Sequence, residues 1–361
     1  MFVATFMHGT MGKGAARWWR ALWLAWVVVA WAAQPSLAQR LTWLGTLGGN
    51  RSEATGVSAD GSVVVGRARN AAGQYRAFRW TAARGMQNLG TLGGGESVAL
   101  GVSADGSVVV GVADNAAGQL RAFRWTAARG MQDLGTLGGD ESVAYGVSAD
   151  GSVVVGWAEN SAGQRRAFRW TGGRMQDLRT LDSDESVAYG VSADGSVVVG
   201  SARNAAGQWR AFRWQNGVMQ DLGTLDGSES EAWGVSADGS VVVGRARNAV
   251  GRWRAFRWTA AGGMRDLGTL DGNSSWALGV SADGSVVVGW AENAEGYQRA
   301  FRWTAAGDME DLNIAYAHLL TDGSVLLEAR AISPDGRYVV GWGYNAATGN
   351  FEAFLLDTRR T

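Results

Sequence analysis

The chemically useful side chains that recur most often belong to the word Gly-Val-Ser-Ala-Asp-Gly, which begins at residues 56, 101, 146, 190, 234 and 279. A serine in a tight turn could serve as a nucleophile if a base and a third, orienting group lay beside it. The only histidines are His8 and His318, and six equivalent serines cannot share one base. We therefore interpret Ser103, Asp105 and their equivalents as turn-forming residues and predict no catalytic residue.

A set of glutamates, each followed by serine, occupies one aligned position between repeats: Glu96, Glu141, Glu185 and Glu229. Oxygen ligands of this kind suit a hard cation such as Ca²⁺, or they could recognise a cationic group. The symmetry fails at Arg51 and Ser274, which hold the same position in other copies. The alternative is that these are solvated acids at strand ends. Ca²⁺ at these glutamates is a hypothesis, and no other cofactor is expected.

Aromatic residues follow the loop Asn-Ala-Ala-Gly-Gln in some copies, at Tyr75, Trp209 and Trp253, whereas other copies hold Leu120 or Arg165. Exposed aromatic rings at a loop margin could stack on sugars or other ligands. Packing within the framework is the alternative interpretation. These three aromatics are the candidate ligand-binding residues.

Arginines and aspartates recur at matched positions of a predicted hairpin, and antiparallel pairing would place the members of each pair side by side. We expect a structural role for them, with an arginine ladder for acidic ligands as the alternative. The pairs are Arg124/Asp133, Arg169/Asp177, Arg213/Asp221, Arg257/Asp266 and Arg302/Asp311. Phe123 and Trp125 alternate with Arg124, and their regular spacing predicts core packing.

The elements that carry these residues are short strands. One repeat, Val98 to Leu137, contains four β-branched or apolar runs separated by Asp-Gly, Asn-Gly or Gly-containing turns, which predicts four strands and no helix. In another copy the last turn shrinks to Asn216-Gly217, a strong hairpin signal. Four strands in about 40–45 residues is the size of a propeller blade.

The two ends of the repeat array complement each other. Leu41–Gly49 matches a fourth strand without the preceding three, and the C-terminal segment supplies three strands without a fourth. A ring explains this split because the N-terminal strand then completes the last blade and removes open sheet edges. We predict an all-β fold, a seven-bladed β-propeller of four-stranded antiparallel blades. A β-solenoid or β-prism-like array is the alternative. The longer connection Ile314–Leu327 is expected to be a plain insertion, with a loop over the ring as the alternative.

The first 38 residues have the order of a secretory signal: Lys13, Arg17 and Arg20, then an apolar run, then Ser36-Leu37-Ala38. We expect cleavage after Ala38, residues 39–361 as a single propeller domain, and a secreted or periplasmic location. A membrane anchor is the alternative, although the apolar run is short for a span. Residues 39–361 hold three more acidic than basic residues, which disfavours nucleic acid as a partner. The chain has no cysteine, which excludes disulfides and thiolate chemistry.

The recurring run Ala122-Phe123-Arg124-Trp125-Thr126, followed by Gly130-Met131-Gln132-Asp133-Leu134-Gly135-Thr136-Leu137-Gly138-Gly139, resembles the HAF family of bacterial extracellular repeat proteins, named for a His-Ala-Phe word. The resemblance covers the whole repeat array and implies export and a β-rich repeat fold. The first letter departs from the family, because this chain has Arg at residues 76, 121, 166, 210, 254 and 299 and Glu at 352. The family implies no established activity.

These observations favour an exported, non-enzymatic repeat propeller that binds, or acts as a scaffold for, a glycan, a peptide or a cell-surface partner. We expect a monomer without a membrane span after signal cleavage. The alternative is a hydrolase or lyase that uses carboxylates and a cation on an extracellular polymer. A third interpretation is a recently amplified array in which no site is selected. Catalysis should break the repeat symmetry at one or two copies, and His318 in the long connection is the single outlier.

Overall fold

Each copy of the repeat folds into four antiparallel strands in the computed structural model, which describes residues 39–359. The predicted all-β class and the four-stranded antiparallel sheets are confirmed. The predicted signal peptide, residues 1–38, lies outside the described residues. The first strand of each copy lies nearest the centre of the array, and the second strand pairs with it. The first strands are β2 (Gly48–Val57), β6 (Gly93–Val102), β10 (Gly138–Val147), β14 (Asp182–Val191), β18 (Asp226–Val235), β22 (Asp271–Val280) and β26 (Val325–Ile332). The second strands are β3 (Val64–Asn70), β7 (Val108–Asn115), β11 (Val153–Asn160), β15 (Val197–Asn204), β19 (Val241–Asn248), β23 (Val286–Asn293) and β27 (Tyr338–Asn345).

The outer two positions are shorter or more exposed. The third strands are β4 (Tyr75–Thr81), β8 (Leu120–Thr126), β12 (Arg165–Thr171), β16 (Trp209–Gln215), β20 (Trp253–Thr259), β24 (Gln298–Thr304) and β28 (Asn350–Asp357). The fourth strands are β5 (Gly85–Asn88), β9 (Gly130–Asp133), β13 (Arg174–Asp177), β17 (Val218–Asp221), β21 (Gly263–Asp266), β25 (Asp308–Asp311) and β1 (Arg40–Trp43).

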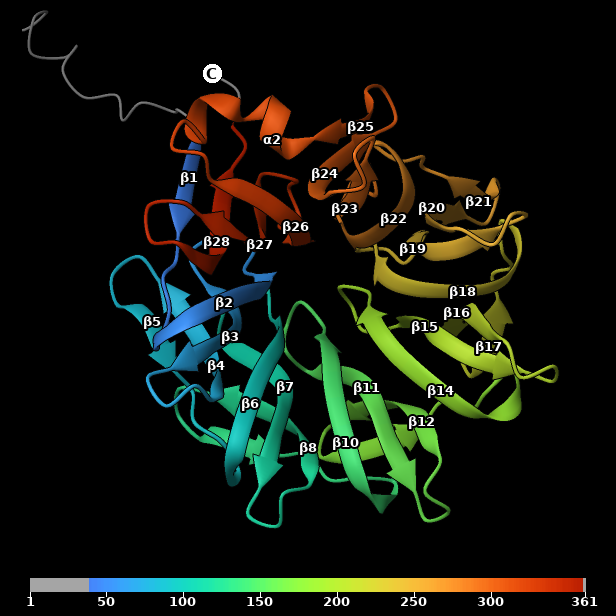
Figure 1. Ribbon diagram of the computed structural model, residues 1–361. Coiled ribbons are helices and arrows are strands. Elements are labelled where there is room, and N and C mark those ends of the chain that lie inside the picture. The colour runs from blue at the N-terminus through green and yellow to red at the C-terminus, as the bar shows by residue number, and fades with distance from the viewer. Residues whose placement is uncertain (1–38, 360–361) are drawn as a thin grey trace, which may run out of the picture. The chain divides into compact units, whose positions relative to one another are not determined.

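The sheets follow one another around a common centre, as Figure 1 shows for the unit Arg40–Thr358. Five sheets have four strands, and an eight-stranded sheet combines β2–β5 with β26–β28 and β1. A single parallel bridge between Arg51 and Phe351 joins its two halves. The first strand β2 contacts both β6 and β26. The arrangement is propeller-like.

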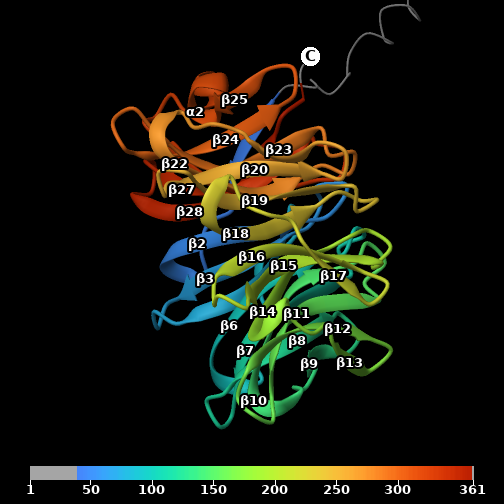
Figure 2. The same ribbon diagram turned by 90° about the vertical axis from the view of Figure 1, so that its right-hand side faces the viewer.

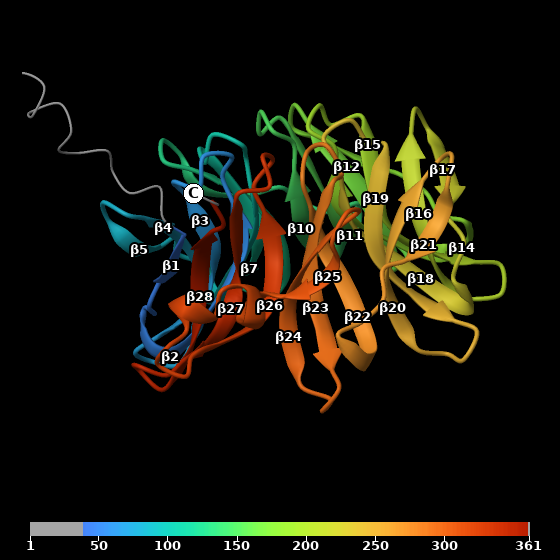
Figure 3. The same ribbon diagram turned by 90° about the horizontal axis from the view of Figure 1, so that it is seen from above.

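The N-terminal strand β1 lies beside β28, where Figure 3 shows blue next to dark red. The pairing is antiparallel, with Arg40 opposite Asp357 and Trp43 opposite Phe354. A second link comes from β2, because the Ala353 backbone N–H donates to Ser52 Oγ at 2.8 Å. The first and last strands of the described residues therefore share one sheet.

The core lies between consecutive sheets, which pack face to face (Figure 2). In one such layer Val65 and Ala77 of one sheet contact Val109 and Phe123 of the next, all of them fully buried. Each buried phenylalanine contributes about 1.5–3 kcal/mol through removal of apolar surface from water. Core packing of Phe123 is confirmed, and Trp125 packs against the same layer while remaining partly exposed.

The turn between first and second strands is built by the Ser-Ala-Asp word. Ser103 Oγ donates to Asp105 Oδ1 at 2.6 Å and accepts the Val108 backbone N–H at 3.0 Å. The Ala104 backbone N–H donates to the Ala149 carbonyl of the next turn at 3.0 Å, so neighbouring sheets are also linked by their turns. The turn interpretation of Ser103 and Asp105 is confirmed.

The predicted pairing of Arg124 with Asp133 is wrong by one residue of register. Arg124 lies opposite Gln132, and Phe123 lies opposite Asp133. Because side chains alternate between the two faces of a strand, this shift sends Arg124 away from Asp133. The arginines of this set instead donate to the carbonyl of the next turn's glycine, as Arg169 does to Gly195 at 3.0 Å.

The other four predicted pairs share this outcome. Arg213 and Arg257 also bond turn carbonyls, at 3.0 and 3.1 Å, and Arg302 pairs with Glu310 at 2.8 Å. In four copies the aspartate pairs with a different arginine of the third strand. This arginine lies three residues before the predicted one, at the position where the HAF word has His. These ion pairs are Arg121–Asp133, Arg166–Asp177, Arg210–Asp221 and Arg254–Asp266.

The expectation of no helix is wrong in the long connection, which contains the short helices α2 (Leu312–Ala315) and η1 (Ala317–Leu319). Asp311 caps α2 by accepting the Asn313 backbone N–H. These helices are too short to show a helical periodicity in sequence. Tyr316 is buried against the last sheet, and Figure 1 places α2 at the outer side of β24 and β26. No helix in the described residues is long and apolar enough to span a membrane.

Candidate functional site

A cavity of about 520 Å³ lies at the centre of the array, lined by the first strands. Volumes of this order hold a small ligand or a short stretch of a larger one. One position of each copy, the residue two before the shared valine or isoleucine, contributes a lining side chain. These side chains are Thr55, Leu100, Tyr145, Tyr189, Trp233, Leu278 and Arg330. Trp276, Trp290 and Glu328 add further side chains to the lining, and we call this space the central cavity.

One wall of the central cavity is aromatic. Tyr145 meets Tyr189 edge to face at 5.0 Å between ring centroids, and Tyr189 stacks on Trp233 at 4.1 Å. Trp276 and Trp290 form a further pair at 5.2 Å. Burial raises the pKa of both tyrosines above the usual value. They therefore stay neutral phenols over the physiological pH range.

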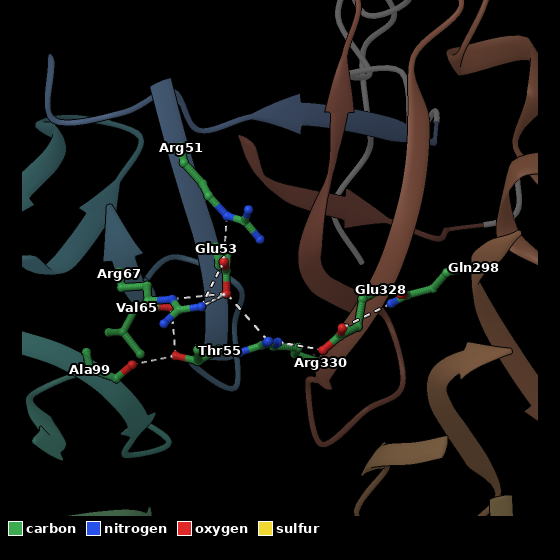
Figure 4. A network of polar contacts seen from close by, with 9 residues as sticks. All are labelled: Arg51, Glu53, Thr55, Val65, Arg67, Ala99, Gln298, Glu328 and Arg330. Atoms are coloured by element: carbon green, nitrogen blue, oxygen red, sulfur yellow. Dashed lines mark hydrogen bonds and ion pairs between the residues drawn. The ribbon is translucent and has the colours of Figure 1, made fainter. Parts of the chain in front are cut away.

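A polar network is centred on Glu53 (Figure 4), and its members Arg330 and Glu328 line the central cavity. The Glu53 carboxylate accepts from Arg51 at 2.9 Å and from Arg67 at 2.8 Å, and it lies 3.4 Å from Arg330. Arg330 also pairs with Glu328 at 2.6 Å, so its guanidinium is held between two carboxylates. Burial by itself raises the pKa of Glu53, but Arg330, Arg67 and Arg51 together hold it below its usual value.

The structure does not bring the four candidate metal-ligating glutamates together. Glu185 pairs with Arg203 at 2.8 Å and Glu229 with Arg247 at 2.9 Å, each within its own sheet. Glu96 accepts the Tyr75 backbone N–H at 3.3 Å, and no interaction is formed by Glu141 among the described residues. Within residues 39–359, no group of three or more His, Cys, Asp or Glu side chains could hold a metal ion.

The candidate aromatics Tyr75, Trp209 and Trp253 are all half-buried and each is covered by arginine. The guanidinium of Arg203 lies 5.0 Å from the Trp209 ring, and that of Arg67 lies 4.7 Å from Tyr75. Two arginines cover Trp253, at 4.2 and 4.5 Å. Cation–π contacts of this kind favour the framework role that was the alternative for these rings. Trp209 also packs on the apolar cluster that contains Tyr189.

The lining position itself was not among the residues predicted from the sequence. Five residue types (Thr, Leu, Tyr, Trp and Arg) occupy this position in the seven copies, whereas the turn that follows stays nearly the same. Variation at a position that directly precedes a constant turn is a visible signal in the sequence. The structure shows that this position lines the central cavity, which the sequence alone did not reveal.

The comparison with known proteins gave structural matches at low sequence identity and no sequence match. No family model matches the sequence, and no curated protein matches it. Among solved structures, TolB from Acinetobacter baumannii is 11% identical with a TM-score of 0.48, over 88% of this chain and 65% of that one. A putative TolB from Agrobacterium tumefaciens is 14% identical with a TM-score of 0.49, over 77% and 95%. Hydrazine synthase from Kuenenia stuttgartiensis is 15% identical with a TM-score of 0.48, over 89% and 98%.

Proposed function

We propose that this chain is an exported, non-enzymatic binding or scaffold module, built as a seven-bladed β-propeller whose last blade is completed by the N-terminal strand. The antiparallel pairing of β1 with β28 and the contacts of β2 with β26 support the closed ring. The signal-like order of residues 1–38 supports export to the periplasm or beyond. The partner is a glycan, a peptide or a surface molecule that reaches the central cavity.

One observation carries the binding function: the repeat is nearly uniform in its turns and core and varies where it lines the central cavity. Seven equivalent lining positions hold Thr, Leu, Tyr, Tyr, Trp, Leu and Arg. A ligand touching several blades at once demands different chemistry from each.

The charged groups at the central cavity support binding over catalysis. Glu328 is the carboxylate of the lining, and it is paired with Arg330 at 2.6 Å. Glu53 is surrounded by three arginines that lower its pKa. A general acid needs the opposite environment, one that raises its pKa toward the working pH. His318 lies in η1, outside the residues that line the cavity.

A Trp233→Ala variant tests the proposal. We expect binding to a ligand found on a glycan array, a peptidoglycan panel or a peptide library to weaken at least about tenfold, because Trp233 lines the cavity and stacks on Tyr189. Tyr297→Ala is the matched control, since Tyr297 is an exposed aromatic that does not line the cavity. Circular dichroism and thermal unfolding confirm that both variants fold. Equal loss in both variants, or no ligand in any of the three panels, would contradict a binding function at this site.

A further inference from the structure

We propose that the central cavity takes a ligand in which a carboxylate stands next to an apolar group, with the carboxylate on the guanidinium of Arg330. This inference rests on the proposed binding function and names its ligand class. Two sources share this chemistry: the C-terminus of a peptide and a free small organic acid.

Arg330 and Glu328 are the charged members of the Glu53 network that line the central cavity, and Arg330 is the more exposed of the two. The acidic side chains are buried, with 1% of Glu53 and 10% of Glu328 exposed. The basic side chains are accessible, with 30% of Arg330, 32% of Arg67 and 35% of Arg51 exposed. At the cavity the network therefore presents the Arg330 guanidinium more than the Glu328 carboxylate.

The balance of charges and donors in this network also favours an anion. Three arginines face two glutamates, which leaves one positive charge uncompensated. A guanidinium has five N–H donors, more than these two carboxylates use. A carboxylate matches the planar guanidinium better than other anions of similar size, because it accepts two parallel hydrogen bonds. Of the three arginines, Arg330 lines the central cavity.

The aromatic wall indicates what accompanies the carboxylate. Stacking of Tyr189 on Trp233 covers one face of each ring. A sugar stacks on free aromatic faces, and a stacked pair offers fewer of them than two separate rings. Leu100 and Leu278 extend this wall with aliphatic surface. The combination favours an acid with an apolar side group over a neutral sugar.

The test compares acids with their amides on the unaltered protein. For a small organic acid, the pair is N-acetylphenylalanine and its amide, N-acetylphenylalaninamide. For a chain end, the pair is the peptide Gly-Leu-Phe with a free C-terminus and the same peptide with an amidated C-terminus. Calorimetric titration should show each acid binding at least about tenfold more tightly than its amide, because only the acid supplies the anion for Arg330. Tighter binding of the peptide than of the amino acid identifies a chain end as the source, and the reverse identifies a small acid.

Variants then locate the carboxylate. Arg330→Gln should remove the preference for acid over amide, and Arg330→Lys should keep part of it through charge alone. Arg302→Gln is the matched control, because Arg302 also pairs with a glutamate, Glu310 at 2.8 Å, but lies outside the cavity lining. We expect that variant to bind like the parent.

Two results would overturn the inference: equal binding of acid and amide by the unaltered protein, or an acid preference that survives Arg330→Gln. If acids fail while another ligand binds in a Trp233-dependent manner, the carboxylate inference falls and the binding function stands. If nothing binds, both fall.

Discussion

At the scale of single residues, the copies differ in charge at the position of Glu53. The position of Glu53 is held by valine in three copies, by glutamate in two others and by tryptophan in one. Glu53 differs from the remaining glutamates at this position in being fully buried. A buried carboxylate is stable only when nearby cations and hydrogen bonds replace the lost water. The three arginines around Glu53 do this and thereby fix the guanidinium of Arg330 at the cavity wall.

Replacing Glu53 with glutamine should destabilise the protein by about 3 kcal/mol near pH 7, because it leaves three arginines without their shared anion. Since the folded state lowers the pKa of Glu53, this stabilisation is present above the unfolded-state pKa near 4.5. It is lost as the pH falls through the lower folded-state value. Urea unfolding of parent and variant at several pH values between about 3 and 7 should show a difference that shrinks below about pH 4.5.

Asp133→Asn is the control for this prediction. Asp133 forms an ion pair with Arg121 at 3.1 Å, but 37% of its side chain is exposed. Exposed pairs contribute about 0–1 kcal/mol, so this variant should unfold like the parent. A pH-independent difference between parent and Glu53→Gln would show that the ionised carboxylate is not the source of the stability.

At the scale of elements, the register of the hairpin between third and fourth strands determines which side chains pair across it. The alternation of residue types did not reveal this register. The hairpin between third and fourth strands was predicted from its turn residues, and in one copy Asn216 and Gly217 both take the left-handed conformation at φ 52° and 84°. The partner of each arginine was predicted wrongly, because a shift of one residue exchanges the two faces of a strand. Loop lengths differ among copies, so spacing in the sequence did not reveal the register.

The pairing of first and second strands requires the glycine that ends the Val-Val-Val-Gly run. A Cβ at Gly156 would overlap the Val143 carbonyl of the neighbouring strand, so first and second strands could not pair at their present separation. Gly156→Ala should destabilise the protein by about 3 kcal/mol, the upper end for overpacking of a core. Thermal unfolding measures the effect.

Gly163→Asn provides the comparison for Gly156→Ala. Gly163 lies in a loop at φ +73° with no atom near its missing Cβ, and asparagine tolerates that conformation. A change below about 1 kcal/mol is expected. Similar unfolding temperatures for the two variants would contradict the role of close strand approach.

At the scale of the whole molecule, the feature that matters is the sheet shared by both ends of the chain. Arg40 lies opposite Asp357, in the same relation as Gly130 to Thr126 in an unbroken copy. In that copy residues 127–129 form the turn. A three-residue loop from Asp357 to Arg40 should therefore restore an ordinary hairpin.

A circular permutant that joins Asp357 to Arg40 in this way, with new termini within residues 127–129, should fold with an unfolding temperature within about 5 °C of the parent, since exposed turns tolerate chain breaks. A permutant opened between Val109 and Val110, both fully buried, should not fold. Differential scanning calorimetry and gel filtration measure both. A large loss of stability in the first permutant would contradict the closed seven-bladed ring.

The sequence by itself determined the all-β class, the four strands of each copy and the turn role of Ser103 and Asp105. These properties depend on local interactions and on repetition, which are visible in one copy and reinforced by the others. Only the tertiary structure decided which side chains meet. It covered Trp253 with arginines, separated Glu96 from the other candidate glutamates, and brought Arg330 beside Glu53. The contact of Arg330 with Glu53 joins residues far apart in the chain, and neither spacing nor composition records how the sheets are placed around the central cavity.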